Sequence, residues 1–254
     1  MTERETRDAP AHRVGIWHKA VVVSTHSESS TGRSIVLDVP GWGGNIAGQH
    51  ADLRLTAENG YQATRSYSIA SSGDGDRVQI AVDRLNTGEV SPYLVDEIRP
   101  GDQLELRGPL GGWFIWTPTQ PEPVQLIGGG SGIVPLMAMI RSHSASGSHS
   151  PFRLLYSVRS PDDAFFRSEL SAPTPGLEVN WLYTRRAPDG WPRAAARLTT
   201  ADIAAAAFPP TLSPTLSPSV FVCGPTGFVE TVATALVELG HDPLRIRTER
   251  FGGS

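Results

Sequence analysis

The chain has 254 residues, of which 39% are hydrophobic, so it can form one large domain or two of ordinary size. Its net charge of −4 excludes the strong basic excess typical of nucleic-acid-binding domains. Cys223 is its single cysteine, which excludes an intramolecular disulfide and a four-cysteine iron–sulfur cluster held by these residues alone.

The N-terminal residues are polar and charged, and we expect residues 1–12 to form a mobile tail. They lack the apolar centre of a signal peptide. The sequence also contains no run of about 20 apolar residues, the length a membrane helix needs. We therefore expect a cytoplasmic protein without a membrane partner.

Residues 13–118 are predicted to form an antiparallel β-barrel domain. Their short segments are rich in β-branched residues, often alternate apolar with polar positions, and are separated by turns of glycine, asparagine and aspartate. A short helix is expected after the fifth strand. The expected strands are residues 16–27, 33–39, 50–57, 64–71, 77–85 and 103–107, and the helix is residues 91–98.

The proline-rich segment at residues 117–123 is predicted to be a linker. From residue 123 to 254, apolar runs alternate with segments of helical spacing, which predicts a five-stranded parallel sheet with helices on both faces. The expected strands are residues 124–130, 151–160, 177–185, 219–225 and 244–251, and the expected helices are residues 131–143, 163–170, 199–208 and 227–240.

A glycine-rich turn, Gly128 to Pro135, stands where the first of these strands gives way to a helix. Glycines let a phosphate approach the backbone, and a helix N-terminus offers free N–H groups. Proline in the first helical turn costs no hydrogen bond. A plain connecting loop is an equally good interpretation of the glycines alone, but the strand–turn–helix context favours a pyrophosphate site.

Two further segments place chemically useful side chains at strand ends. Alternation puts Arg65 and Tyr67 on one strand face, where they suit a phosphate and a planar heterocycle. These residues alone favour an exposed edge strand. Cys223 ends a parallel strand, where α/β sheets bind ligands, although a lone cysteine is most often a buried structural residue.

Five motifs occur in order along the chain: RSYS at 65–68, GEVS at 88–91, GGGSGIVP at 128–135, CGP at 223–225 and ERF at 249–251. This series resembles the ferredoxin–NADP reductase superfamily, and most of all bacterial stand-alone reductase components of oxygenase-type electron-transfer chains. The resemblance implies a flavin-binding barrel followed by an NAD(P)-binding α/β domain. It also implies an oxidoreductase that transfers hydride from NAD(P)H to bound FAD.

The resemblance assigns a role to each motif residue near the flavin. Arg65 holds a flavin phosphate, Tyr67 packs on the isoalloxazine, and Ser68 lies near flavin N5. Residues 88–91 present a helix N-terminus to the flavin phosphates, with Ser91 typical of a helix cap. Phe251 covers the flavin. The expected flavin-binding residues are Arg65, Ser66, Tyr67, Ser68, Gly88, Val90, Ser91 and Phe251.

The same resemblance assigns the nicotinamide nucleotide to the second half of the chain. The glycine turn takes the pyrophosphate, the CGP turn approaches the nicotinamide, and Glu249 lies near the reacting centre. The catalytic residues Ser68, Cys223 and Glu249 orient and polarise without forming covalent intermediates, and no metal is expected. The expected nucleotide-binding residues are Gly129, Gly130, Ser131, Gly132, Pro135, Arg159, Arg185, Cys223, Gly224 and Pro225.

The expected donor is NADPH rather than NADH. Arg159 follows the second strand of the α/β half and suits a 2′-phosphate, while Arg185 adds positive charge after the third strand. Asp162 and Asp163 are close enough to neutralise Arg159, and a solvated charged loop is an alternative. FAD is favoured over FMN by the resemblance.

The electron acceptor is expected to be external: a ferredoxin-like carrier, another redox partner protein or a small molecule. Two alternatives stay open. One is a non-catalytic flavin- or nucleotide-binding subunit of a redox complex, and the other is a reductase that releases free reduced flavin. The sequence indicates no oligomeric state.

Overall fold

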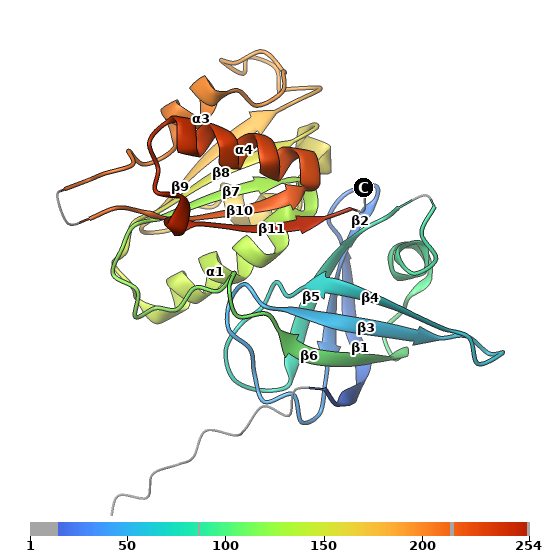
Figure 1. The fold of residues 1–254 in the computed structure, drawn as a ribbon. Helices are drawn as coiled ribbons and strands as arrows, with labels where there is room; N and C mark the ends of the chain where they lie inside the picture. The colour runs from blue at the N-terminus through green and yellow to red at the C-terminus, as the bar shows by residue number, and fades with distance from the viewer. Residues whose placement is uncertain (1–14, 86, 214–215, 253–254) are drawn as a thin grey trace, which may run out of the picture.

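The computed structural model describes residues 15–252, except residues 86 and 214–215. The predicted tail at residues 1–12 lies outside the described residues. Figure 1 shows two units joined through the segment between β6 and β7. One contains a six-stranded antiparallel sheet and the other a five-stranded parallel sheet, so the predicted β plus α/β fold is confirmed.

The antiparallel sheet has the strand order β4-β3-β6-β1-β2-β5. A bridge between Ile69 and Ile80 joins its two outer strands and closes the sheet into a barrel. Alternate apolar side chains, such as Ile35 and Leu37 on β2, point inwards and are fully buried. Its strands are β1 (Trp17–Ser27), β2 (Gly32–Asp38), β3 (His50–Thr56), β4 (Gln62–Ser68), β5 (Arg77–Asp83) and β6 (Gln103–Leu110).

The helix expected at residues 91–98 is a short π-helical turn, η1 (Tyr93–Glu97), which covers one side of the barrel. Its Leu94 and Val95 are buried in the barrel core. Ser91 does not cap this turn, contrary to expectation. Its hydroxyl oxygen instead accepts a hydrogen bond from the Leu85 N–H at 3.0 Å, which ties the turn to the loop after β5.

The parallel sheet has the order β11-β10-β7-β8-β9. Its central strand β7 is buried at every position, because helices cover both faces, and this explains its mostly apolar sequence, in which the polar side chain of Gln125 is buried as well. Helix α1 packs on one face, and α3 and α4 pack on the other. The elements are β7 (Val124–Gly129), η2 (Gly130–Gly132), α1 (Ile133–Ser146), β8 (Phe152–Val158), η3 (Pro161–Asp163), α2 (Arg167–Ser171), β9 (Leu177–Tyr183), α3 (Thr200–Ala206), β10 (Ser219–Pro225), α4 (Thr226–Glu238), η4 (Pro243–Arg245) and β11 (Ile246–Phe251).

The helix predicted at residues 163–170 is interrupted, and only its second part forms α2. Phe166 adopts a left-handed backbone conformation with φ of 55°. Tertiary hydrogen bonds hold it there, because the Phe165 N–H donates to the Tyr156 hydroxyl and the Phe166 N–H donates to Glu28 of the barrel. These bonds replace the helical bonds that the local sequence favours.

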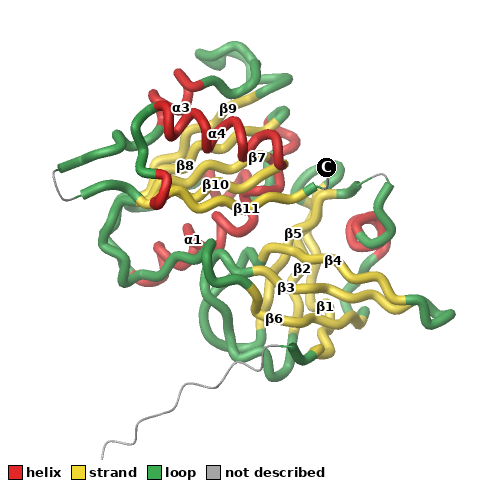
Figure 2. The backbone as a smooth tube through the Cα atoms, in the orientation of Figure 1, coloured by secondary structure: helices red, strands yellow, loops and turns green. Residues whose placement is uncertain are grey.

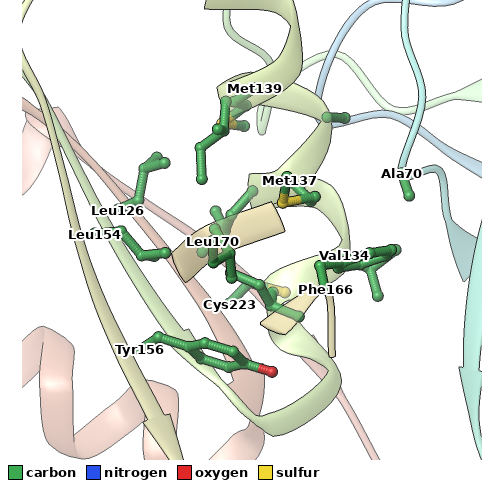
Figure 3. Close-up of a cluster of buried hydrophobic side chains, with 14 of the residues drawn as sticks. Ala70, Leu126, Val134, Met137, Met139, Leu154, Tyr156, Phe166, Leu170 and Cys223 are labelled. Atoms are coloured by element: carbon green, nitrogen blue, oxygen red, sulfur yellow. The ribbon is translucent and has the colours of Figure 1, made fainter. Parts of the chain in front are cut away.

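The two units share a core. Figure 3 shows Ala70, from the loop after β4, facing Val134 and Phe166 of the α/β unit. Arg141 on α1 reaches across the same boundary and donates to the Ala70 carbonyl oxygen at 3.0 Å and to the Gln79 side chain at 2.7 Å. Among the described residues, no helix combines the length and apolar composition needed to cross a membrane.

Candidate active site between the barrel and the parallel sheet

Two adjoining cavities lie where strand ends from both units meet. The Arg65 cavity has a volume of about 390 Å³, within the range of ligand-binding pockets, and is lined by the RSYS and GEVS segments. The glycine-turn cavity, of about 220 Å³, lies beside it. Asp83, Ser131 and Phe251 line both cavities. A larger cavity of about 540 Å³ lies away from these strand ends, along α2 and the β1–β2 hairpin.

β4 forms one wall of the Arg65 cavity. Arg65 is exposed and lines the cavity, and its guanidinium donates to the Thr64 carbonyl oxygen at 2.7 Å, whereas Tyr67 packs on the barrel core. Burial raises the pKa of Tyr67 to about 12, so its ring carries a neutral hydroxyl at physiological pH. Ser66 donates to Asp52 at 2.6 Å, and Asp52 also pairs with Arg107, which anchors β4 to its neighbours.

The GEVS segment forms the opposite wall of the Arg65 cavity. Gly88, Val90 and Ser91 line the cavity, and Val90 is buried in the barrel core. The bond from the Leu85 N–H to Ser91 closes this loop on itself. The segment is therefore held in place by the barrel before any ligand binds.

Close backbone contact decides the shape of the glycine turn. A Cβ on Gly132 would lie 2.2 Å from the Cys223 carbonyl oxygen, so only glycine lets the turn pack on β10. Gly130 has φ of 55° and open space beside it, which suits close approach by a ligand. Pro135 lies in the first turn of α1, where a backbone N–H has no partner within the helix, so its missing N–H removes no helical hydrogen bond.

Phe228 on α4 explains two of the other motif glycines. A Cβ on Gly129 would lie 2.8 Å from the Phe228 ring, and one on Gly224 would lie 2.7 Å from it. The ring thus fills the space that both glycines leave, and it lines the glycine-turn cavity together with Pro225. The sequence analysis missed Phe228, although its place one turn after the CGP motif is a signal that could have found it.

Ser68, Glu249 and Cys223 are brought together at the junction of the units. The Ser68 hydroxyl donates to Glu249 Oε1 at 2.9 Å, across 181 positions of sequence. Glu249 pairs in register with Cys223 on neighbouring strands. Burial raises the pKa of Glu249, and the Ser68 hydrogen bond and the nearby charge of His50 oppose this only in part.

Cys223 is 1% exposed. Burial, and next the negative charge of Glu249, raise the pKa of its thiol, so the thiol stays protonated and is a poor nucleophile. Cys223 is not among the residues that line the two cavities, so its assignment to the catalytic residues stays a prediction.

Phe251 ends β11 and stands between the two cavities. Its side chain is 37% exposed, and its strand position is opposite Pro225. Asp83, at the end of β5, also belongs to both cavities, and the sequence analysis missed it. Nothing in its local sequence distinguishes it from an ordinary strand-terminal aspartate.

The two arginines proposed for a 2′-phosphate lie at strand ends of the parallel sheet. Arg159 lines the glycine-turn cavity and is exposed, and Arg185 is exposed just beyond β9. Asp162 does not neutralise Arg159, because it forms an ion pair with Arg186 instead. A neighbouring cavity of about 250 Å³ adds Arg197 to this surface, a residue that the sequence analysis did not single out.

The residues present fit a flavin and a nicotinamide nucleotide. The Arg65 cavity offers an aromatic ring, a guanidinium and a small hydroxyl side chain, and the glycine-turn cavity offers bare backbone at a helix N-terminus. Shared wall residues place the two cavities edge to edge. Such an arrangement brings two planar ligands together and requires no charged nucleophile.

Two family profiles match the chain. The family described as Oxidoreductase FAD-binding domain matches residues 19–115, and the one described as Oxidoreductase NAD-binding domain matches residues 126–234. The chain is also 31% identical over 215 residues to ferredoxin–NADP reductase B of Sorangium cellulosum, an alignment that covers 81% of this chain and 84% of that protein.

Other relatives are longer than this chain. It is 32% identical over 211 residues to the ferredoxin reductase component of 3-ketosteroid-9-alpha-monooxygenase of Rhodococcus rhodochrous, covering 80% of this chain and 55% of that protein. Among solved structures, the FAD/NAD-binding domain of nitric oxide dioxygenase from Vibrio cholerae is similar with a TM-score of 0.79 and 26% identity. That match covers 93% of this chain and 99% of that one.

Proposed function

Because the chain belongs to the ferredoxin–NADP reductase superfamily of FAD-dependent NAD(P)H oxidoreductases, we propose that it oxidises NADPH and passes electrons singly to a separate carrier protein. The observation that carries this proposal is the pair of adjoining cavities that share Asp83, Ser131 and Phe251. A flavin in the Arg65 cavity and a nicotinamide in the glycine-turn cavity would meet at these shared residues.

Each wall of the site has a proposed task. Arg65 would neutralise flavin phosphate, Tyr67 would pack on the ring system, and the glycine turn would bind the nucleotide pyrophosphate. Bound flavin supplies the chemistry of accepting a two-electron hydride and releasing single electrons. The protein residues hold both rings in position and keep water away from them.

The Ser68–Glu249 pair is proposed to position polar atoms at the reacting centre. Ser68 ends β4 beside Tyr67, and its hydroxyl proton is directed to Glu249 Oε1. A carboxyl whose pKa is raised by burial exchanges protons nearer to neutral pH than an exposed one. The pair can therefore hold or accept a proton there, and Cys223 supports it as a neutral neighbour.

The choice of NADPH is supported by Arg159 and Arg185. Both guanidinium groups stand at the carboxyl edge of the parallel sheet. Of the two aspartates that could compete, Asp162 is paired with Arg186, and Asp163 lines the glycine-turn cavity with Arg159 and accepts a hydrogen bond from Ser160. A guanidinium binds a phosphate dianion through two parallel hydrogen bonds. No such gain exists for the ribose hydroxyl of NADH.

The choice of a carrier protein is supported by cysteine content and by relatives. The 254 residues contain one cysteine, which is buried, so they cannot ligate a four-thiolate cluster. The Rhodococcus relative is named as a ferredoxin reductase component of a monooxygenase. An electron from these 254 residues would accordingly pass to a one-electron carrier that lies outside them.

The test is an anaerobic titration of the purified flavoprotein with NADPH and, separately, with NADH, in which the visible spectrum of the flavin is recorded at each addition. Bleaching by NADPH at far lower concentration than by NADH is expected. Arg159→Ala should raise the NADPH concentration required about tenfold and leave the NADH titration unchanged, whereas Arg77→Ala, in a surface ion pair with Asp38, should alter neither. Equal bleaching by both nucleotides in the unaltered protein would refute the donor assignment.

The acceptor is tested with the reduced protein. Transfer to a [2Fe–2S] ferredoxin should be faster than transfer to free FMN or a quinone at equal concentration. Transfer only to free flavins or quinones would refute the carrier proposal and favour a reductase that releases reduced flavin. Bound flavin that neither nucleotide reduces would instead indicate a non-catalytic subunit.

A further inference from the structure

The edge of the barrel continues past the Arg65 cavity to an exposed aromatic ring, Tyr61. Side chains at alternate positions of an extended strand share one face, so Tyr67, Arg65, Ala63 and Tyr61 form a single row. The strand geometry extends to Tyr61, because its carbonyl oxygen accepts a hydrogen bond from the Ala57 N–H at 2.8 Å. At about 3.3 Å per residue, Tyr61 lies about 13 Å beyond Arg65 along this row.

A hydrogen bond holds the Tyr61 ring beside the cavity. Its hydroxyl donates to Glu89 Oε2 at 3.1 Å, and Glu89 lies between Gly88 and Val90, which line the cavity. The bond joins the β3–β4 hairpin to the GEVS wall, while Tyr61 itself remains 58% exposed. A ring that is held at its hydroxyl and is more than half exposed can stack on a planar ligand.

A second exposed apolar side chain stands at the same end. Leu85 lines the cavity and is 60% exposed. The loop that carries it is tied to Ser91, and Glu89 lies in the same loop. Leu85 in the cavity wall and Tyr61 on the hairpin bonded to that wall are thus two large side chains exposed to solvent.

The order of groups along this row matches the order of groups in a flavin dinucleotide. We propose that Tyr61 is the stacking platform for the adenine ring of FAD, with Arg65 at the phosphates and Tyr67 at the isoalloxazine. This rests on the proposed flavin chemistry of the Arg65 cavity. FMN ends at its single phosphate and would not reach Tyr61, so the residue selects FAD over FMN.

The test measures flavin binding, separately from turnover. The full-length protein is freed of flavin and titrated with FAD and, in parallel, with FMN, by fluorescence quenching. Stacking of a base on an aromatic side chain predicts that Tyr61→Ala weakens FAD binding by about fivefold to a hundredfold, while FMN binding is unchanged. Tyr61→Phe keeps the ring and should retain FAD binding within about threefold of the unaltered protein.

Controls separate a stacking role from a structural one. Leu244→Ala removes an exposed apolar side chain in the α/β unit, 82% exposed, and should affect neither flavin. An equal loss of FAD and FMN affinity in Tyr61→Ala would overturn the proposal, because it would assign the ring to support of the Glu89 loop. Unchanged FAD affinity would overturn it as well. Uptake of neither flavin by the unaltered protein would instead refute the function proposed above, and this proposal with it.

Discussion

Replacing Gly132 by alanine should displace the glycine turn from β10 and weaken nucleotide binding, while the barrel stays folded. The backbone of Gly132 has an ordinary helical φ of −63°, so alanine brings no backbone strain. The entire effect is steric, since the new Cβ would lie 2.2 Å from the Cys223 carbonyl oxygen and 2.7 Å from the Gly224 nitrogen. Both atoms are backbone in a buried strand and cannot rotate away.

The magnitude follows from the displacement required. The Cβ must move about 1 Å to reach ordinary contact with the oxygen, and insertion of a methyl group into a packed region costs about 1–3 kcal/mol. The turn would move relative to β10, so we expect the nucleotide dissociation constant to rise about tenfold, as 1.4 kcal/mol of lost binding implies. Bound flavin should be retained, because the Arg65 cavity is built mainly by the barrel.

The assay is a titration of oxidised flavoprotein with NADP⁺ and with NAD⁺, combined with thermal unfolding. Gly112→Ala is the matched control, because a Cβ there meets nothing within 4 Å and its φ is not left-handed. An unchanged nucleotide dissociation constant in Gly132→Ala would refute the reasoning, as would equal effects of the two alanine substitutions.

Three further predictions concern buried polar contacts. Burial raises the pKa of Glu249, so the folded protein loses stability as pH rises from 4.5 through the folded pKa and this carboxyl ionises. Glu249→Gln does not ionise, so its Tm should rise relative to that of the unaltered protein between pH 4 and pH 8. A Tm difference that stays constant with pH would contradict this. Although burial of Asp52 opposes it, hydrogen bonds from Ser66 and Arg107 lower the pKa of Asp52, so its stabilisation is present above pH 3.8 and is lost below it. Asp52→Asn should cost about 1–2 kcal/mol at pH 7, a modest value because the Arg107 side chain is 38% exposed, and thermal melts at pH 7 and pH 3 should show the deficit shrinking in acid. Glu28→Ala leaves the buried Phe166 N–H without its acceptor and should lower the free energy of unfolding by about 1–3 kcal/mol, measured with denaturant. Glu28→Gln keeps an acceptor oxygen, so its free energy of unfolding should fall less. Equal losses of unfolding free energy in the two variants would show that the charge of Glu28, and not the hydrogen bond, matters.

Local pattern accounts for most of the fold. Alternation along β2 and β5 and the mostly apolar run of β7 predicted strands, because period-two geometry and two-sided burial both produce recognisable sequence patterns. The helix expected at residues 163–170 failed for the opposite reason. Its backbone N–H groups are taken by Tyr156 and Glu28, which are remote in sequence and carry no local signal.

The same distinction applies to the candidate site. The RSYS, GEVS, glycine-turn, CGP and ERF segments could be singled out from the sequence, because each is a short run of unusual residues at the end of one element. Asp83 could not, since an aspartate after a strand is ordinary in isolation, and Phe228 is marked only by its place one turn after the CGP motif. They matter only because strand ends from two units meet around them.

The sequence by itself therefore determined the two kinds of sheet, their order along the chain, and the short motifs that carry the resemblance. Only the tertiary structure decided which side chains meet. Ser68 and Glu249, 181 positions apart, share a hydrogen bond because β11 pairs with β10 at the edge of the parallel sheet and ends against the barrel. Periodicity encodes which face of a strand is buried, whereas contact between units depends on how two finished surfaces pack together.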